Sequence, residues 1–451
     1  MGKITLKQAA AWCGGTVEAK YEDVEFLGAC NDTRVLKEGQ LFLALKGARD
    51  GHDFIPQAME KGAAAVLCER SVGDYPAIIV EDTRIALGKI ANGERHRIGM
   101  KVVGVTGSVG KSTTKEMIST VLETTFRTAK TPANHNNDIG MPMGILAMPE
   151  DTQVAVLEMG MNHFREMAYL SEIGEPDLAV IVNIGTMHIE HLGSQEGILQ
   201  AKLEILEGMK PGTPILLNGD DKLLRTAACG RHPVTYFGTG DNAAVRGSDV
   251  EITTGCVRFR TVAEGMEHTI ELPVEGEHFV CDALAAVAVG LNLGVEPGRI
   301  QESLANFRNM AGRQEIYEKE GFHIISDCYN AGPESMAAAL KVLGRQEGRK
   351  IAVLGDMLEL GPCTQAEHYK VGRFAAEQAD YLLAYGPNSD RMEKGALTGG
   401  MTGGKARSFT DRRDLVIALK RLARPGDVLL FKGSRGMHME LALEMFFTDE
   451  K

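Results

Sequence analysis

Short apolar runs separated by helical patterns recur along most of the chain. Between residue 99 and about residue 225 these runs are 102-VVGV-105, 154-VAVL-157, 178-LAVIVNI-184 and 215-ILLN-218. Continuous apolar runs flanked by helices are typical of strands that are buried on both faces. The pattern therefore predicts βαβ units around a mostly parallel sheet.

The same alternation occurs before and after this segment. Upstream it predicts helices at 6–13, 54–61 and 83–98 and strands at 41–45, 64–67 and 77–80; downstream it predicts strands at 323–327, 351–356, 381–386 and 428–433, with helices near 335–346, 366–379 and 411–422. Around 257–272 the period changes to two, which predicts antiparallel strands before a helix at 281–290. We predict an α/β protein of three domains: a small α/β domain (1–98), a central domain with a mostly parallel sheet (99–313) and a C-terminal Rossmann-like domain (314–451).

Composition and charge argue against several classes of protein. The 451 residues carry a formal net charge of −12, whereas a nucleic-acid-binding face needs clustered basic residues. No apolar run approaches the ~18 residues of a membrane span, and the first residues, MGKITLKQAAAWCGG, lack a signal-peptide core. The eight cysteines are scattered without a C-x-x-C pair, as in proteins with reduced thiols. We expect a cytoplasmic, monomeric protein with neither a nucleic-acid partner nor a membrane segment.

The strongest motif follows the first strand of the central domain. In 102-VVGVTGSVGKSTTKEM-117 a predicted strand leads through two glycines to Lys111, Ser112 and a helix predicted over 113–124. The N–H groups of such a turn hold phosphate, while the lysine adds a point charge and the serine a magnesium ligand. The usual pattern GxxxxGK[ST] has glycine where Val105 stands, and a glycine-rich turn without a ligand is the alternative. The flanking strand and helix favour a nucleoside triphosphate site, and hence a P-loop domain.

Polar side chains follow several of the predicted strands. Glu158 and His188 do so in the central domain, and Asp327, Asp356 and Lys432 do so in the third domain. Ligands of open α/β sheets bind beyond the carboxyl ends of the strands. A single carboxylate there is more often a solvated cap, so the argument depends on several groups meeting. Two polar edges, each with half a site, predict catalysis in a cleft between domains.

Lys202 occupies an unusual position. In 194-SQEGILQAKLEILEGMK-210 it shares a helical stripe with Ile198, Ile205 and Met209. One interpretation is that the stem packs on the apolar face while the ammonium reaches water. The other is that the charge is neutralised or chemically changed within a site.

Three asparagines precede a glycine in 134-NHNNDIGMP-142. Asn134, Asn136 and Asn137 are the residue type that commonly makes turns. The alternative is that their amides present donors and acceptors to a polar substrate.

Taken together, these segments resemble the Mur ligase family over essentially the whole chain. The matching segments are 32-DTRVLKEGQLFLALKGARDGHDF-54, TGSVGKSTTKE, NHNNDIGMP, Glu158-Met159-Gly160, His188, 201-AKLEI-205, 327-DCYNAGPESM-336, 355-GDMLELG-361 and 432-KGSRG-436. The phosphate loop is also found in folylpolyglutamate synthetases, so it does not decide the branch. The NN-x-x-G-x-P, D-x-Y-N-A and GDM-x-ELG segments resemble the branch that acts on D-alanyl-D-alanine.

The resemblance implies an ATP-dependent amide ligase of peptidoglycan synthesis. Its small-molecule substrates would be UDP-N-acetylmuramoyl-tripeptide and D-alanyl-D-alanine, and the tripeptide carboxylate would be activated as an acyl phosphate. It also implies two Mg²⁺ sites and a carbamylated lysine at Lys202, which would account for a lysine on an apolar stripe. The competing classes are another amide ligase, such as folylpolyglutamate synthetase, which lacks an N-terminal UDP-binding domain, and a phosphate-loop switch protein.

The residue roles that the resemblance implies fall into four groups. The catalytic residues would be Lys111, Glu158, His188, Lys202 and Arg313. ATP would contact Gly107, Ser108, Val109, Gly110, Lys111, Ser112, Thr113, His278, Asp282, Arg313 and Asp327. The substrates would contact Asp32, Thr33, Arg34, Asn134, Asn136, Asn137, Tyr329 and Asn330, and the metal ligands would be Ser112, Glu158, His188 and Lys202.

Two positions depart from the family pattern. Gly332 stands where family members usually have asparagine in Y-N-A-N-P, which affects a turn near substrate. Asp282 also stands where asparagine is usual, which puts the adenine contact there in doubt. Neither departure removes a group that the chemistry needs.

Overall fold

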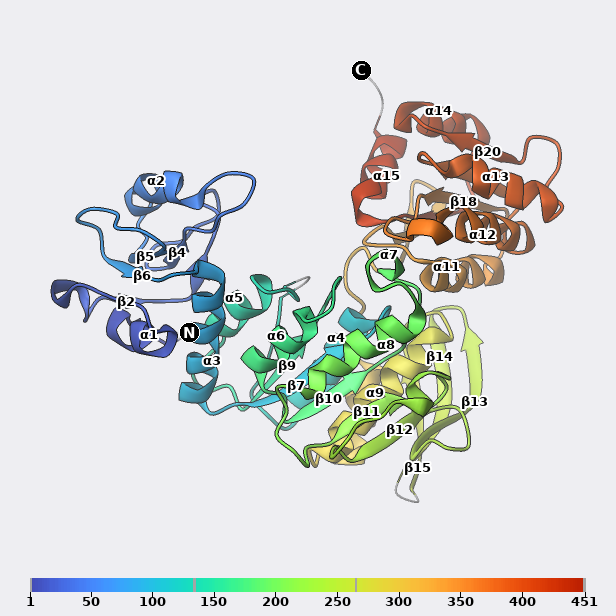
Figure 1. Ribbon diagram of the computed structural model, residues 1–451. Helices are drawn as coiled ribbons and strands as arrows, with labels where there is room; N and C mark the ends of the chain where they lie inside the picture. The colour runs from blue at the N-terminus through green and yellow to red at the C-terminus, as the bar shows by residue number, and fades with distance from the viewer. Residues whose placement is uncertain (1, 133–134, 264–265, 449–451) are drawn as a thin grey trace.

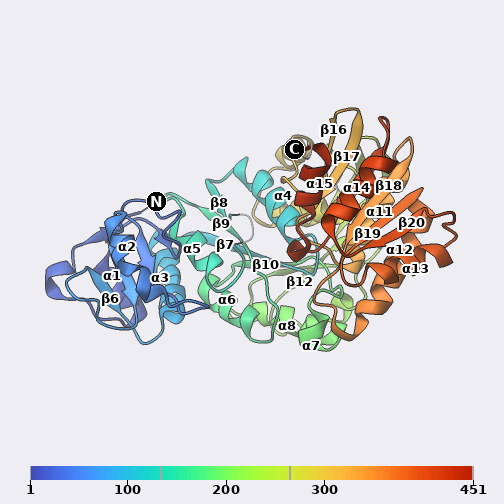
Figure 2. The same cartoon turned by 90° about the horizontal axis from the view of Figure 1, so that it is seen from above.

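The computed structural model describes residues 2–132, 135–263 and 266–448. Its three lobes follow one another along the chain, with the central domain between the N-terminal and C-terminal domains (Figures 1 and 2). This arrangement confirms the predicted fold class, three α/β units with mostly parallel sheets. The exact domain boundaries stay a prediction. No helix among the described residues is both long and apolar enough to span a bilayer.

The N-terminal domain contains a four-stranded parallel sheet in the order β3-β4-β5-β6 and a two-stranded antiparallel pair, β1-β2. The strands are β1 (Ile4–Thr5), β2 (Glu25–Phe26), β3 (Ala29–Cys30), β4 (Leu41–Leu43), β5 (Ala65–Cys68) and β6 (Ala77–Ile79), and the helices are α1 (Leu6–Cys13), α2 (Ile55–Glu60) and α3 (Thr83–Ile98). Helix α3 matches its predicted bounds: Asp82 caps its start, and Gly99, with φ of 72°, ends it.

The central domain is built on a nine-stranded sheet in the order β15-β14-β13-β12-β11-β10-β7-β9-β8. Its strands are β7 (Lys101–Thr106), β8 (Thr128–Lys130), β9 (Val154–Glu158), β10 (Leu178–Ile181), β11 (Ile215–Asn218), β12 (Val234–Gly238), β13 (Val245–Thr253), β14 (Cys256–Ala263) and β15 (Met266–Leu272). Strands β13 to β15 pair antiparallel, as the period of two predicts, and the others pair parallel.

The helices of the central domain cover both faces of this sheet. They are α4 (Lys111–Glu123), α5 (Gly140–Leu146), α6 (Glu166–Gly174), α7 (Ile189–Leu192), α8 (Gln195–Leu203), α9 (His278–Asn292) and α10 (Pro297–Ala305). Successive strand residues alternate between two apolar clusters: Val156 packs with α4, α9 and α10, while Ala155 and Leu157 pack with α5, α6 and α8. Helix α4 begins two residues earlier than predicted, at Lys111, because its first turn is already part of the glycine loop.

The C-terminal domain has a six-stranded sheet in the order β16-β17-β21-β18-β19-β20. The strands are β16 (Glu315–Lys319), β17 (Phe322–Asp327), β18 (Lys350–Gly355), β19 (Tyr381–Tyr385), β20 (Ala406–Phe409) and β21 (Val428–Lys432), and the helices are α11 (Pro333–Arg345), α12 (Thr364–Gln378), α13 (Ser389–Thr398), α14 (Arg412–Leu422) and α15 (Met439–Phe447). All pairs are parallel except β16-β17, so the four predicted strands form a doubly wound core extended by two edge strands.

The eight cysteines are all free thiols. Five of them are buried, and the other three, Cys256, Cys281 and Cys363, are partly exposed. The absence of disulfide bonds at all eight positions agrees with the expectation from their scattered spacing.

Candidate active site

A cavity of about 510 Å³ lies between the central and C-terminal domains. Sixteen of the candidate residues line it: Ser108, Val109, Gly110, Lys111, Ser112, Thr113, Asn136, Asn137, Glu158, His188, His278, Asp282, Arg313, Asp327, Tyr329 and Asn330. Gly107 and Lys202 do not line it, and Asp32, Thr33 and Arg34 belong to the N-terminal domain. The structure thus brings together the polar edges of two sheets.

The glycine loop joins the end of β7 to the start of α4. Gly110 has a φ of 83°, which favours glycine, and a Cβ there would lie 2.8 Å from Asp282 Oδ1. Gly110 is also the N-cap of α4 and gives it no side-chain cap. The first N–H groups of α4 therefore lack the partner that a capping residue would supply, and they form a site for an anion.

Lys111 folds back over the loop. Its Nζ donates to the carbonyl oxygens of Gly107 at 2.9 Å and Ser108 at 3.1 Å. Withdrawal from solvent lowers the pKa of Lys111, Arg313 lowers it further, and Glu158 opposes the change. These cations give the loop a surplus of positive charge, which suits a triphosphate.

Asn183, at the end of β10, holds the loop from the side. Its Oδ1 accepts from the N–H groups of Ser108 at 3.0 Å and Val109 at 2.9 Å, and its Nδ2 donates to Val109 O at 2.9 Å. Gly185 N donates to Ser108 Oγ at 2.8 Å. The loop conformation is therefore fixed by residues from the neighbouring strand rather than by its own sequence alone.

Glu158 is the centre of a buried polar cluster beneath the loop. Ser112 Oγ donates to Glu158 Oε2 at 2.6 Å, and Asn136 Nδ2 donates to Glu158 Oε1 at 2.9 Å. Lys115 Nζ lies 3.8 Å from Glu158 Oε2, and Arg313 donates to Ser112 Oγ at 2.8 Å. Arg313 Nε, in contrast, is a buried donor with no partner among the described residues. An orphaned guanidinium donor next to the loop is a place for an anionic ligand.

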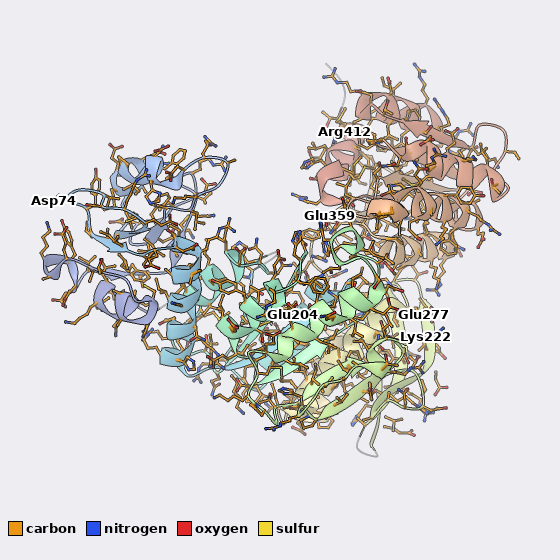
Figure 3. The ribbon with its side chains drawn as sticks, viewed as in Figure 1. Asp74, Glu204, Lys222, Glu277, Glu359 and Arg412 are labelled. Atoms are coloured by element: carbon orange, nitrogen blue, oxygen red, sulfur yellow. The ribbon has the colours of Figure 1, made fainter. Side chains whose placement is uncertain are left out.

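The candidate metal ligands are only partly assembled. Ser112 and Glu158 present adjacent hydroxyl and carboxylate oxygens, the hard donors that Mg²⁺ prefers. His188 instead pairs through Nδ1 with Glu359 Oε2 of the C-terminal domain at 2.6 Å, at the domain junction where Figure 3 labels Glu359. In the part of the chain that the structure describes, no three histidine, cysteine or acidic residues cluster closely enough to hold a metal by themselves.

Lys202 is enclosed on the buried face of α8. It is 2% exposed, and its stripe partners Ile198, Ile205 and Met209 are buried as well. Burial lowers the pKa of Lys202 well below its usual value, and the nearby Lys111 adds to this. The side chain therefore does not reach bulk water, and its amine favours the neutral form.

The C-terminal wall of the cavity carries a second charged group. Lys432 Nζ donates to Asp327 Oδ2 at 2.5 Å and to Asn330 O at 3.0 Å, so the ends of β17 and β21 are tied together. The guanidinium of Arg313 lies 4.0 Å from the centre of the Tyr329 ring. Asp356 also follows a strand of this domain, but its carboxylate accepts a hydrogen bond from Asn388 N and does not line the cavity.

Asp282 lies behind the loop on α9. It is 3% exposed and accepts from Thr114 Oγ1 at 2.8 Å. Burial raises the pKa of Asp282 to about 7, although Thr114 and Arg313 act in the opposite direction. The carboxyl that replaces the usual amide thus changes charge near neutral pH, one turn of chain away from the cavity residue His278.

The asparagines divide between the two interpretations. Asn137 Oδ1 accepts from Gly140 N at 2.8 Å and so stabilises the start of α5, which is a local structural role. Asn136 holds Glu158, as described above. Asn134 lies outside the described residues.

The N-terminal candidates form a separate, open group. Arg34 pairs with Asp32 at 2.6 Å while 86% of its side-chain surface stays exposed. Thr33 is buried and donates to Gln57 Oε1 at 2.8 Å. Of this group only Arg34 is largely exposed, and none of the three residues lines the central cavity.

Three further residues belong to the site but are absent from the predicted set: Asn183, Lys115 and Glu359. Asn183 lies two residues after the end of β10 but inside the apolar run 178–184 from which that strand was predicted, so the strand-end argument did not select it. Lys115 lies one helical turn after Ser112, a spacing that places both on one face. Glu359 belongs to the GDM-x-ELG segment, but that motif does not indicate its partner, because His188 is 171 positions away.

Comparison with known proteins agrees with this geometry. Three family models match the chain: the Mur ligase family catalytic domain at residues 24–95, the Mur ligase middle domain at 105–290 and the Mur ligase glutamate ligase domain at 312–435. A Bacillus subtilis protein, UDP-N-acetylmuramoyl-tripeptide–D-alanyl-D-alanine ligase, is 41% identical, with 98% of this chain and 97% of the relative aligned.

Solved structures extend the comparison to three dimensions. MurF from Acinetobacter baumannii has a TM-score of 0.91 at 33% identity and covers 99% of both chains. A MurF ligase from Thermotoga maritima, solved in complex with ADP, has a TM-score of 0.82 at 31% identity and covers 93% of this chain and 96% of its own. Sequence, domain order and structure agree along the whole length, and the chain belongs to the Mur ligase family.

Proposed function

We propose that this chain is an ATP-dependent ligase that joins D-alanyl-D-alanine to UDP-N-acetylmuramoyl-tripeptide, a step in the synthesis of a peptidoglycan precursor. The observation that carries the proposal is the cavity in which the glycine loop, the Ser112–Glu158 pair and Arg313 meet the C-terminal strand ends. The substrates follow from the name of the relative at 41% identity over nearly the full length.

ATP would bind with its phosphates at the loop. Three groups of donors would bind the phosphates: the uncapped N–H groups at the start of α4, the Nε of Arg313, which has no partner among the described residues, and the Lys111 ammonium. Lys111 would exchange its loop carbonyls for phosphate oxygens, and Asn183 would keep the loop in shape during that exchange. Asp327 and Asp282 would lie on the nucleoside side of the cavity, together with His278.

A Mg²⁺ ion fits the pair formed by Ser112 and Glu158. Both oxygens are buried, and they already lie 2.6 Å apart. When bound there, the ion would neutralise charge on the transferring phosphoryl group. Asn136 and Lys115 would hold the carboxylate in position, and Arg313 would stabilise negative charge on the γ-phosphate.

Lys202 and His188 are the candidates for a second metal site. The neutral amine that burial favours at Lys202 is the form that reacts with CO₂, and the product is a carbamate with two oxygens. His188 would have to leave Glu359 in order to turn toward a metal. These two requirements support the proposal that the second site is completed only when ligands bind.

The reaction needs an activated carboxylate, because a carboxylate is a poor electrophile. The terminal carboxylate of the tripeptide would attack the γ-phosphorus of ATP and form an acyl phosphate, with loss of ADP. The amine of D-alanyl-D-alanine would then attack the acyl carbon, and phosphate would leave. Asp32, Thr33 and Arg34 would hold the UDP end of the muramyl substrate, while Tyr329 and Asn330 would face its reacting end.

The test is phosphate release measured with each substrate omitted in turn. With Mg-ATP, release should require both the muramyl tripeptide and D-alanyl-D-alanine. A folate with glutamate serves as the competing arm, since a folylpolyglutamate synthase shares the fold at 16% identity. Equal turnover in that arm, with none on the muramyl substrate, would refute the proposal.

A further inference from the structure

The family departure at Gly332 lies in a contact between the two domains that form the cavity. Gly332, at the start of α11, is buried, and a Cβ built on it would lie 2.3 Å from Met187 Sδ of the central domain. An asparagine, the usual family residue, cannot occupy this position while Met187 stays in place. Glycine at 332 thus permits the C-terminal domain to pack directly onto the segment that follows β10.

Two residues further on, Glu334 makes a polar contact with the same segment. Its Oε1 accepts from Thr186 N at 2.9 Å and lies 3.1 Å from Thr186 Oγ1. A Cβ on Gly185 would lie 3.0 Å from the Glu334 carboxylate, so the absence of a side chain at 185 allows this close approach. Gly185, Thr186 and Met187 therefore form a surface that receives Gly332 and Glu334.

The other side of this segment holds the phosphate loop. Gly185 N donates to Ser108 Oγ, and Asn183 binds the N–H groups of Ser108 and Val109. Ser108 is 3% exposed and lines the cavity. Since Ser108 Oγ accepts from Gly185, its hydroxyl hydrogen is free to donate to a ligand. Glu334 is thus linked to the loop through the two successive backbone N–H groups of Gly185 and Thr186, one of which donates to Ser108 and the other to Glu334.

We propose that Glu334 is a positioning residue for the phosphate loop: it docks the C-terminal domain on Thr186 and thereby sets the orientation of Ser108 toward the ATP phosphates. The proposal rests on the proposed function only in taking ATP as the ligand. Gly332 leaves room for Met187 at this contact, and Glu334 makes the hydrogen bonds to Thr186. Glu334 also lines the cavity, but its hydrogen-bonded path to the loop runs through Gly185 and Thr186.

Binding of a non-hydrolysable ATP analogue with Mg²⁺, measured by calorimetry on the full chain, tests the inference. Glu334→Ala should weaken binding about 5- to 10-fold, as expected for the loss of a charge-assisted contact. Glu334→Gln should stay within about 2-fold, because its amide oxygen still accepts from Thr186 N. Glu347→Ala, an exposed carboxylate of the same domain, is the matched control. Equal affinities for Glu334→Ala and the control would overturn the inference.

Two further measurements separate positioning from general stability. In a Ser108→Ala background the effect of Glu334→Ala should shrink to within about 2-fold, because the two act through one path; an undiminished effect would overturn the inference. Gly332→Asn should weaken analogue binding like Glu334→Ala, and Met187→Ala added to it should restore most of the loss. Failure of that rescue in a variant with an unchanged melting temperature would also count against it. If the unmodified chain fails to bind the analogue, the proposed function itself is wrong.

Discussion

The N-terminal domain meets the central domain through an apolar core that both share, whereas the C-terminal domain meets it through polar side chains around a cavity. One hydrophobic cluster runs from Ile4 through Ile90 on α3 to Met167 on α6. The clusters of the C-terminal domain are made of residues from Tyr317 onward. Its contacts with the central domain include Glu334 to Thr186, described above.

This difference indicates which of the two outer domains can move relative to the central domain. Opening an apolar junction exposes buried surface to water, at about 25 cal/mol for each Å². Polar contacts exchange partners with water at a much smaller net cost. We therefore expect domain motion near Gly312, whose φ is 71°, rather than near Gly99, although both glycines are plausible hinges in the sequence.

The largest expected effect is at the polar junction. Lys111→Ala should lower turnover by about 10³-fold at saturating ATP, because the ammonium neutralises the transferring phosphate. The melting temperature should stay unchanged. Steady-state kinetics and thermal unfolding measure the two quantities, and Lys101→Ala, an exposed lysine of β7, is the control. Near-normal turnover would show that the loop holds no phosphate.

Lys202→Ala should lower turnover by about 10²-fold or more, because the variant lacks the carbamate oxygens that would bind the metal. Short-chain carboxylic acids added to this variant should restore part of the activity by supplying those oxygens. Lys210→Ala, an exposed lysine in the same segment, should behave like the unmodified chain. Near-native activity of Lys202→Ala would show instead that the lysine only packs.

The apolar junction should respond in the opposite way. Ile90→Ala removes a fully buried side chain from the shared core and should lower the free energy of unfolding by about 2–5 kcal/mol. Turnover per folded molecule should change little. Ile85→Ala on the same helix, 49% exposed, should cost far less. Urea unfolding compares the two variants, and equal costs would mean that α3 does not join the two domains.

A pH-dependent effect of comparable size is expected at Asp282. Because burial raises its pKa from 3.8 to about 7, the folded state holds a proton that the unfolded state releases near pH 4. Stability should therefore fall as pH rises from about 4 to about 7, by an amount on the order of 4 kcal/mol. Asp282→Asn lacks this loss, so it should be the more stable protein at pH 8 and equal near pH 4. Urea titrations at both values measure the difference, with Asp23→Asn as control.

The smallest expected signal is a change of shape. Solution scattering should show a radius of gyration smaller by a few per cent, on the order expected for closure of one domain, when ATP analogue and muramyl substrate are both bound. Gly312→Ala strains a left-handed backbone position and should alter this change more than Gly99→Ala does. An unchanged radius at verified saturation would contradict closure.

Local patterns were sufficient for the fold class and for the centre of the site. The apolar run before Gly107 and the helical stripe around Lys202 are short-range signals, and the structure places both as predicted. Strand β8 was missed because all three of its residues are only partly buried, which removes the apolar run that identifies a strand.

Side-chain partners far apart in sequence were not predictable in this way. Asn183 reaches Ser108 across 75 positions, and Glu334 reaches Thr186 across 148. Such contacts depend on the order of strands and on how two domains pack, which the periodicity of one segment does not contain.

The distribution of the thiols offers a way to label the enzyme. Cys256 lies at the start of β14 in the central domain, and Cys363 precedes α12 in the C-terminal domain. Burial raises the pKa of the third partly exposed thiol, Cys281, and so suppresses its reactive thiolate. A donor and an acceptor fluorophore should therefore attach preferentially at one position on each domain. Energy transfer between them would follow the two domains through a catalytic cycle without any engineered cysteine.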